Sequence, residues 1–164
     1  RGSVDKYTWK ELGSSFYPSE LQAAFLFAQL EKIDQNLSRR KTLFGRYQEK
    51  LQELQRNGFL RILETPPGCE GNSHMVAIIL RSEEEADYVR LGMNEDGIQA
   101  VIHYVPLHES DMGARLGYSE DDLSLTSKMS KRLIRLPIHN NLTTDDCDFV
   151  VDSLQKHLEA IVRK

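Results

Sequence analysis

The chain has 164 residues, 40% of them hydrophobic, and a formal net charge of −4 at pH 7. A chain of this size and apolar content can bury one hydrophobic core, so we expect a single domain with an attached helical arm. Because there is no basic excess, a nucleic-acid partner held through its phosphates is not expected. The longest apolar run, residues 23–28, is far shorter than the roughly 20 residues that cross a bilayer, so the sequence predicts no membrane insertion.

Neither the cysteines nor the histidines indicate a disulfide or a metal site. Cys69 and Cys147 are the only two cysteines and have no C-x-x-C spacing, and in the cytosol both would stay reduced. The histidines fit no zinc-binding spacing, since His103 and His108 lie five residues apart across a proline. We therefore predict no metal ligand in this chain.

The first predicted helix follows an irregular segment. Residues 1–18 have no sustained hydrophobic period and end at a proline, which disfavours helix at the residue before it. Ser19 is a good N-cap with Gln22 in the first turn, and Gly58 is typical of the position just past a helix C-terminus. The sequence therefore predicts one long helix between Ser19 and Gly58.

This helix has two hydrophobic patterns. In residues 21–30 apolar side chains occupy nearly the whole circumference, which is typical of a helix buried on all sides. We therefore expect something outside this chain to cover it. In residues 30–54 the pattern narrows to a single stripe with steps of three and four, interrupted by Arg40. Arg39, Arg40 and Lys41 are predicted to form a solvated face, with Arg40 placed to reach an acidic partner.

Shorter elements are predicted after Gly58. Strands are expected at residues 59–63, 74–80, 98–105 and 133–138, helices at 82–97, 121–132 and beyond a cap at Thr143 or Thr144, and a loop with a helical turn at 111–119. This order predicts a small sheet covered by helices, an α/β (α+β) fold. We expect residues 1–57 to form the approach segment and interdomain helix, and residues 58–164 to form a small C-terminal domain.

Three stretches of the sequence read VDKYTWKELGSSFYPSELQAA at residues 4–24, HYVPLH at 103–108 and RLPIHNNLT at 135–143. Together they resemble the sugar-nucleotide aminotransferases that use pyridoxal phosphate. The resemblance implies the small C-terminal domain of a fold-type I pyridoxal-phosphate transferase and a cytoplasmic homodimer. It also implies a nucleotide-sugar substrate with glutamate as the amino donor. The DKYTW and LGSS stretches favour the branch that acts on TDP-4-keto-6-deoxy-D-glucose in the synthesis of enterobacterial common antigen and lipopolysaccharide.

The same resemblance implies that the catalytic lysine lies elsewhere. Transamination needs a lysine that holds the cofactor as a Schiff base and moves a proton to and from the substrate carbon. In the family this lysine precedes the stretch that resembles residues 4–9, and no lysine here has its Gly-rich setting. We therefore predict no catalytic residue in this chain and no activity for the chain alone.

One cofactor contact is implied near the start of the chain. Ser15 stands where much of the family has an Asn that reaches across the dimer to the cofactor phosphate of the neighbouring subunit. A serine hydroxyl can donate the same hydrogen bond, although Ser14 and Ser15 can also serve simply as turn residues. The Arg that commonly follows two positions later is Tyr17 here, so no arginine contact is implied.

The substrate contacts are expected elsewhere, at the end of a strand. His103 and Tyr104 precede Pro106, where side chains can project from a rigid element into a cleft. In the family the HY-x-PLH segment approaches the sugar-nucleotide site, so the resemblance implies substrate contacts by His103, Tyr104 and His108. The alternative is a structural His–Tyr pair. Tyr7 is a further candidate at the substrate entrance, or else an aromatic anchor on the core.

A second interpretation of the whole chain is an interaction module without catalysis. In this interpretation the stripe of residues 30–54 forms a coiled coil and the α/β unit binds a ligand without turnover. The stripe is short and contains Arg40, which instead favours packing against its own domain.

Overall fold

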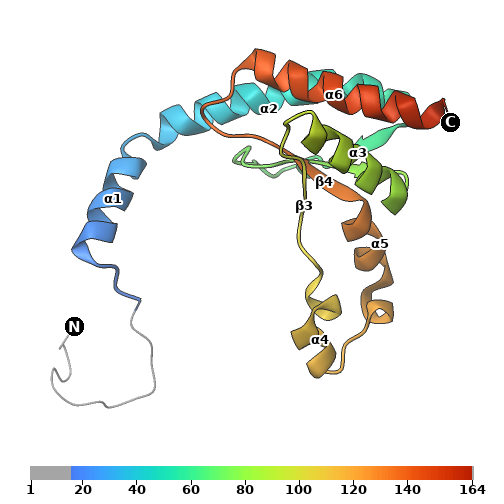
Figure 1. Cartoon of the computed structure of the whole chain (residues 1–164). Helices are drawn as coiled ribbons and strands as arrows, with labels where there is room; N and C mark the ends of the chain where they lie inside the picture. Colours follow the sequence, from blue (N-terminus) through green and yellow to red (C-terminus); the bar gives the residue numbers. More distant parts are fainter. Residues whose placement is uncertain (1–15, 164) are drawn as a thin grey trace. The chain divides into compact units, whose positions relative to one another are not determined.

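The computed structural model describes residues 16–163 (Figure 1). The chain divides into two units, residues 1–34 and residues 35–164, which are described separately. Within the first unit, helix α1 (Glu20–Leu30) begins at Ser19, whose side chain accepts from the backbone of Gln22 while the Gln22 side chain accepts from the Ser19 backbone. This capping box confirms the predicted helix start.

The apolar side chains of helix α1 are exposed in the first unit. None of its residues is buried, and the large apolar side chains are at least half exposed. They are Leu21, Phe25, Leu26, Phe27 and Leu30. The expected cover from outside the chain stays a prediction.

The prediction of one uninterrupted helix was wrong. A turn at Glu31 and Lys32 separates α1 from α2 (Ile33–Arg56), because the backbone N–H of Lys32 bonds to the carbonyl of Gln29, three residues back. No glycine or proline lies at this break, so the usual sequence signals for a helix end are missing. The break falls where the all-round apolar pattern becomes a single stripe.

Helix α2 packs its stripe into the core of the second unit. Leu43, Tyr47, Leu51 and Leu54 are buried on it, and the Tyr47 hydroxyl donates to the carbonyl of Pro137 at 2.8 Å. Burial raises the pKa of the Tyr47 hydroxyl well above its usual range. The packing favours the intramolecular role of the stripe over a coiled coil.

The end of α2 confirms the predicted stop. Gly58 has a φ of +75°, a conformation that residues with a Cβ rarely adopt. The compact second unit begins at residue 35, within α2, whereas the predicted division after residue 57 stays a prediction.

A four-stranded antiparallel sheet lies beside α2. Its strands are β1 (Leu60–Ile62), β2 (Val76–Leu80), β3 (Val101–Ile102) and β4 (Leu133–Leu136), in the order β1-β2-β4-β3. All five residues of β2 are buried, which confirms it as the predicted central strand.

Strand β3 covers only two residues of the predicted range 98–105. Ile98 lies before β3 and belongs to the C-terminal turn of the preceding helix (Glu83–Glu95), because its N–H donates to the carbonyl of Met93. After β3, the chain leaves the sheet towards Pro106, which has no N–H to donate to a ladder.

Two further helices complete the core. Helix α3 (Glu83–Glu95) is capped by Ser82 and helix α6 (Thr144–Val162) by Thr143, both as predicted. Helix α6 runs alongside α2 and α3 (Figure 1), and its predicted apolar face is buried from Cys147 to Leu158. No helix in residues 16–163 has the length and apolar character needed to cross a membrane.

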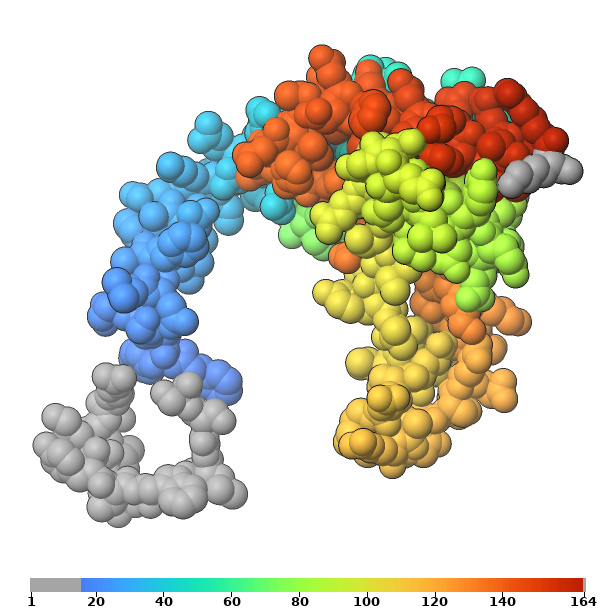
Figure 2. All heavy atoms as spheres, viewed as in Figure 1, coloured from blue at the N-terminus to red at the C-terminus, as the bar shows by residue number. Residues whose placement is uncertain are grey.

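A lobe stands away from this body between β3 and β4 (Figures 1 and 2). It contains a short 3-10 helix (Leu107–Glu109), α4 (Asp111–Arg115), a second 3-10 helix (Glu120–Leu123) and α5 (Ser124–Arg132). The predicted helical turn is α4, and the predicted helix at 121–132 is divided between a 3-10 turn and α5.

Gly92 provides a test of the α3–α6 packing. A Cβ on Gly92 would lie 2.5 Å from Nδ1 of His157, and this ring is fixed by Asp96 at 3.0 Å. We expect Gly92→Ala to lower the free energy of unfolding by about 1–3 kcal/mol, because overpacking forces α3 and α6 apart. Urea unfolding of the chain measures this.

The matched control for this substitution is Gly45→Ala on α2. A Cβ there meets no atom within 4 Å, so we expect a gain of about 0.5–1 kcal/mol from helix propensity. An equal effect of both substitutions would contradict the packing described here.

Candidate functional site

Two of the predicted site residues lie together where the lobe leaves the sheet. His103 and Tyr104 follow the last residue of β3, and their rings meet edge to face with centroids 5.1 Å apart. Both are exposed, and Tyr104 keeps 73% of its surface accessible. Such exposure leaves an aromatic face and a phenol hydroxyl available to a ligand.

Arg135 of β4 joins this pair, although the sequence analysis did not single it out. Its guanidinium carbon lies 5.7 Å from the centre of the Tyr104 ring, within the range of a cation–π contact. Its Nη2 donates to the carbonyl of Ile102 at 3.4 Å. None of the ion pairs among residues 16–163 includes it, and its Nε atom is buried without a hydrogen-bond partner. In the sequence, the signal that could have pointed to Arg135 is a charged residue between Ile134 and Leu136, which are both buried in β4.

Two hollows flank the segment from Tyr104 to Pro106. One has a volume of about 630 Å³ and is mostly apolar, with Leu125, Met129 and Leu133 among its lining residues. The other has about 350 Å³ and carries charged side chains, including Arg90 and Lys131. The segment thus presents an apolar surface on one side and a charged one on the other.

The cations of the charged hollow are already paired. Arg90 contacts Asp87 at 2.9 Å, and Lys131 contacts Glu120 at 2.6 Å. The hydrogen bond that Lys131 donates to Glu120 raises the pKa of Lys131 and lowers the pKa of Glu120. Arg135 is therefore the cation of this region that is best placed to meet an anion from outside the described residues.

His108, the third predicted contact within the lobe, does not present its ring to solvent. It is 7% exposed, and its Nε2 lies 2.9 Å from the hydroxyl oxygen of Ser127 on α5. The structure thus brings His103 and Tyr104 together at the surface and places His108 in the interior of the lobe. A substrate contact by His108 stays a prediction.

Two predicted contacts lie outside the described residues. They are Ser15, expected at the cofactor phosphate, and Tyr7, expected at the substrate entrance. Both stay predictions.

The described lysines do not form a cofactor site by themselves. None of the six in residues 16–163 is buried, and four of them contact carboxylates: Lys41, Lys50, Lys131 and Lys156. A lysine that forms a Schiff base is typically desolvated or placed near another cation. We therefore assign no residue of this range to the anchoring of pyridoxal phosphate.

Metal-ligating side chains do not cluster either. Within residues 16–163 no group of three or more His, Cys, Asp or Glu side chains could hold an ion. Burial raises the pKa of the Cys147 thiol, which disfavours the reactive thiolate form.

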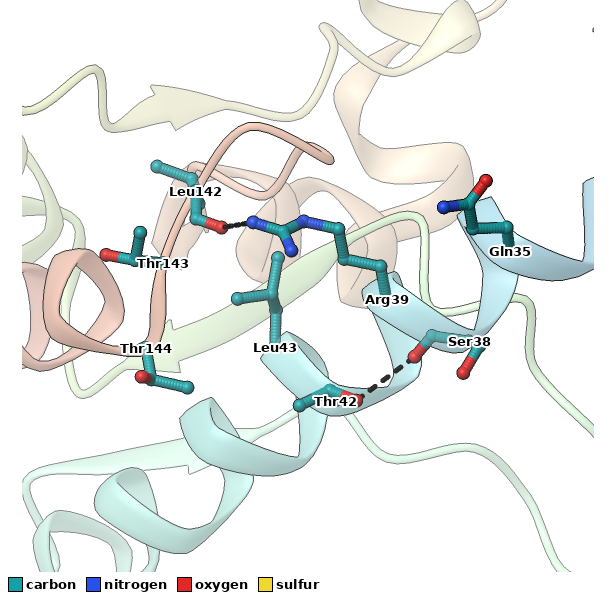
Figure 3. A pocket seen from close by; sticks show the side chains of 8 residues that line it. All are labelled: Gln35, Ser38, Arg39, Thr42, Leu43, Leu142, Thr143 and Thr144. Carbon is teal, nitrogen blue, oxygen red and sulfur yellow. Dashed lines mark hydrogen bonds between the residues drawn. The ribbon is translucent and has the colours of Figure 1, made fainter. Parts of the chain in front are cut away.

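A separate hollow of about 530 Å³ lies between α2 and the start of α6 (Figure 3). Arg39 reaches across it and donates from Nη2 to the carbonyl of Leu142 at 2.9 Å, and from Nε to the carbonyl of Asn140. Arg40 donates to the Asn140 side chain at 3.2 Å. Arg39 is exposed, as a solvated face predicts, and it also bonds to the loop before α6, which the sequence did not indicate. Arg40 is half-buried, and an acidic partner for it stays a prediction.

Residues 1–155 match the model of the DegT/DnrJ/EryC1/StrS aminotransferase family. The chain therefore belongs to this family.

Individual relatives agree with this assignment. The erythromycin biosynthesis sensory transduction protein EryC1 of Saccharopolyspora erythraea is 30% identical over 94% of this chain and 41% of its own length. The UDP-4-amino-4,6-dideoxy-N-acetyl-beta-L-altrosamine transaminase of Campylobacter jejuni is 26% identical over 98% of this chain and 43% of its own. The chain thus spans about two fifths of the length of these relatives.

A solved structure supports the same fold. The crystal structure of DesV from S. venezuelae matches with a TM-score of 0.83 and 26% identity, over 96% of this chain and 41% of that one. This similarity confirms the predicted fold class, a mixed helix and small-sheet domain of a fold-type I aminotransferase.

Arg39 gives a test of the loop before α6. We expect Arg39→Ala to lower the free energy of unfolding by about 1–2 kcal/mol, because two carbonyl acceptors lose a charged donor. Lys41→Ala is the matched control, since it removes the same charge from an exposed pair with Glu70 and should leave stability nearly unchanged. Urea unfolding of both variants measures the difference, and equal losses would refute the role of Arg39.

Proposed function

We propose that the chain is the C-terminal part of a pyridoxal-phosphate aminotransferase that acts on a nucleotide-linked keto sugar. The amino group of glutamate replaces the keto oxygen at C4 of a TDP-4-keto-6-deoxyhexose, and glutamate becomes 2-oxoglutarate. The product then serves cell-surface polysaccharide synthesis in the cytoplasm. The observation that carries this proposal is the family match over residues 1–155.

The substrate class has separate support. The Campylobacter jejuni relative is, by its name, a transaminase of a UDP-linked amino sugar. The TDP nucleotide and the keto group at C4 rest on the DKYTW and LGSS stretches of residues 5–15.

Within this function the chain supplies binding groups. Pyridoxal phosphate, when bound, would supply the carrier chemistry for the amino group. Tyr104 and His103 offer an aromatic face and hydrogen-bonding groups for a sugar, and Arg135 offers a guanidinium for a diphosphate. We propose that this surface serves the substrate of the neighbouring subunit in a homodimer.

Tyr104 tests the proposed substrate surface. In the full-length enzyme we expect Tyr104→Ala to raise KM for the nucleotide sugar about tenfold, which corresponds to about 1.4 kcal/mol of lost binding, with a smaller change in kcat. Phe149→Ala is the matched control, because it removes a similarly exposed aromatic side chain from α6. Steady-state kinetics at saturating glutamate measure both, and an unchanged KM for Tyr104→Ala would refute the assignment.

The chain alone is expected to hold no pyridoxal phosphate. With an equimolar amount of the cofactor, no stable absorbance band at about 420 nm, typical of this cofactor class, should form. Borohydride reduction followed by peptide mass spectrometry should then find no single lysine fully labelled. Complete labelling of one lysine would contradict the prediction.

A further inference from the structure

We propose that His108 is a positioning residue, which holds the loop of residues 103–106 in place for the substrate through its hydrogen bond with Ser127. This inference rests on the proposed function. In it His108 acts through the loop and does not contact the substrate directly.

The contact between the two side chains is buried. His108 is 7% and Ser127 1% exposed, and Nε2 lies 2.9 Å from the serine oxygen. Burial of a polar group without a partner costs free energy. Each side chain therefore holds the other in place, and with it the element that carries it.

The direction of the hydrogen bond follows from the number of protons. The Ser127 hydroxyl has a single proton, and it donates this to the carbonyl of Glu120 at 3.2 Å. Nε2 of His108 must then be the donor to Ser127. One chain of hydrogen bonds thus joins both 3-10 helices of the lobe to α5.

A second set of contacts, with α4, holds the same backbone. A Cβ at Gly113 of α4 would lie 2.9 Å from the carbonyl oxygen of His108 and closer still to that of Leu107. The Ser110 hydroxyl also donates to the Leu107 carbonyl at 2.6 Å and accepts from the Gly113 N–H at 3.1 Å. The backbone at Leu107 and His108 thus packs against α4, while the His108 side chain contacts α5.

Tyr104 depends on this anchor because the sheet stops holding the chain just before it. The ladder between β3 and β4 ends at Ile102, and the four residues that follow lead directly to Leu107. A short segment that is fixed at both ends keeps its side chains within a narrow range of positions. Loss of the His108 anchor would leave only the contacts of Ser110 and Gly113 at that end, and the looser segment would let Tyr104 move away from Arg135.

The experiment uses the full-length enzyme with His108→Leu, Ser127→Ala and His108→Gln. The first two remove the donor and the acceptor, whereas the glutamine amide can still donate from the place of Nε2. We expect KM for the nucleotide sugar to rise about tenfold in His108→Leu and Ser127→Ala, with kcat changed less than about threefold, and to recover in His108→Gln.

Ser153→Ala is the matched control for a purely structural loss. Ser153 lies on α6, outside the lobe. It is also buried, and its hydroxyl donates to Asp96 at 2.7 Å. This variant should lower the thermal midpoint and leave KM unchanged.

Three other outcomes would overturn either the positioning role of His108 or the proposed function. An unchanged KM in both Ser127→Ala and His108→Leu, in an active enzyme, overturns the positioning role. A raised KM in His108→Gln and His108→Leu but not in Ser127→Ala means that His108 contacts the substrate directly, which also overturns it. A folded wild-type enzyme that transfers no amino group to any keto sugar nucleotide overturns the proposed function first, and the inference with it.

Discussion

The complete burial of β2 is the constraint on which the rest of the compact unit depends. A strand with all five residues buried needs hydrogen-bonded neighbours along both edges and apolar cover. Strands β1 and β4 supply the edges, and the stripe of α2 and the apolar face of α6 belong to the same core. Because β2 pairs with β4 and β4 pairs with β3, the position of the lobe follows from this arrangement.

The lobe is held differently, by polar contacts in a region with little apolar core. Its own buried side chains include His108 and Ser127, while much of its apolar surface remains exposed, as at Leu107 and Tyr118. Polar contacts depend more on direction than apolar packing does. A few of them can therefore hold a short binding segment in one position. The candidate substrate surface lies where this polar lobe joins the apolar sheet.

Local signals predicted most of the elements because those elements begin and end with local chemistry. Ser19, Ser82 and Thr143 each accept a backbone N–H three residues later, and Gly58 has the positive φ that ends α2. The break after Leu30 and the shortness of β3 were missed. The break has no glycine or proline to mark it, and the length of β3 depends on pairing with β4, which is distant in the sequence.

The sequence by itself determined the caps, the apolar stripes and the family landmarks, including the exposed pair His103 and Tyr104. Only the tertiary structure decided that Arg135 stacks on Tyr104, that Arg39 crosses to the loop before α6 and that His108 turns inward to Ser127. The physical reason is distance along the chain. Caps and helical stripes arise within a few residues, whereas these three contacts join residues between 19 and 103 positions apart, and only the folded sheet and its helices bring them together.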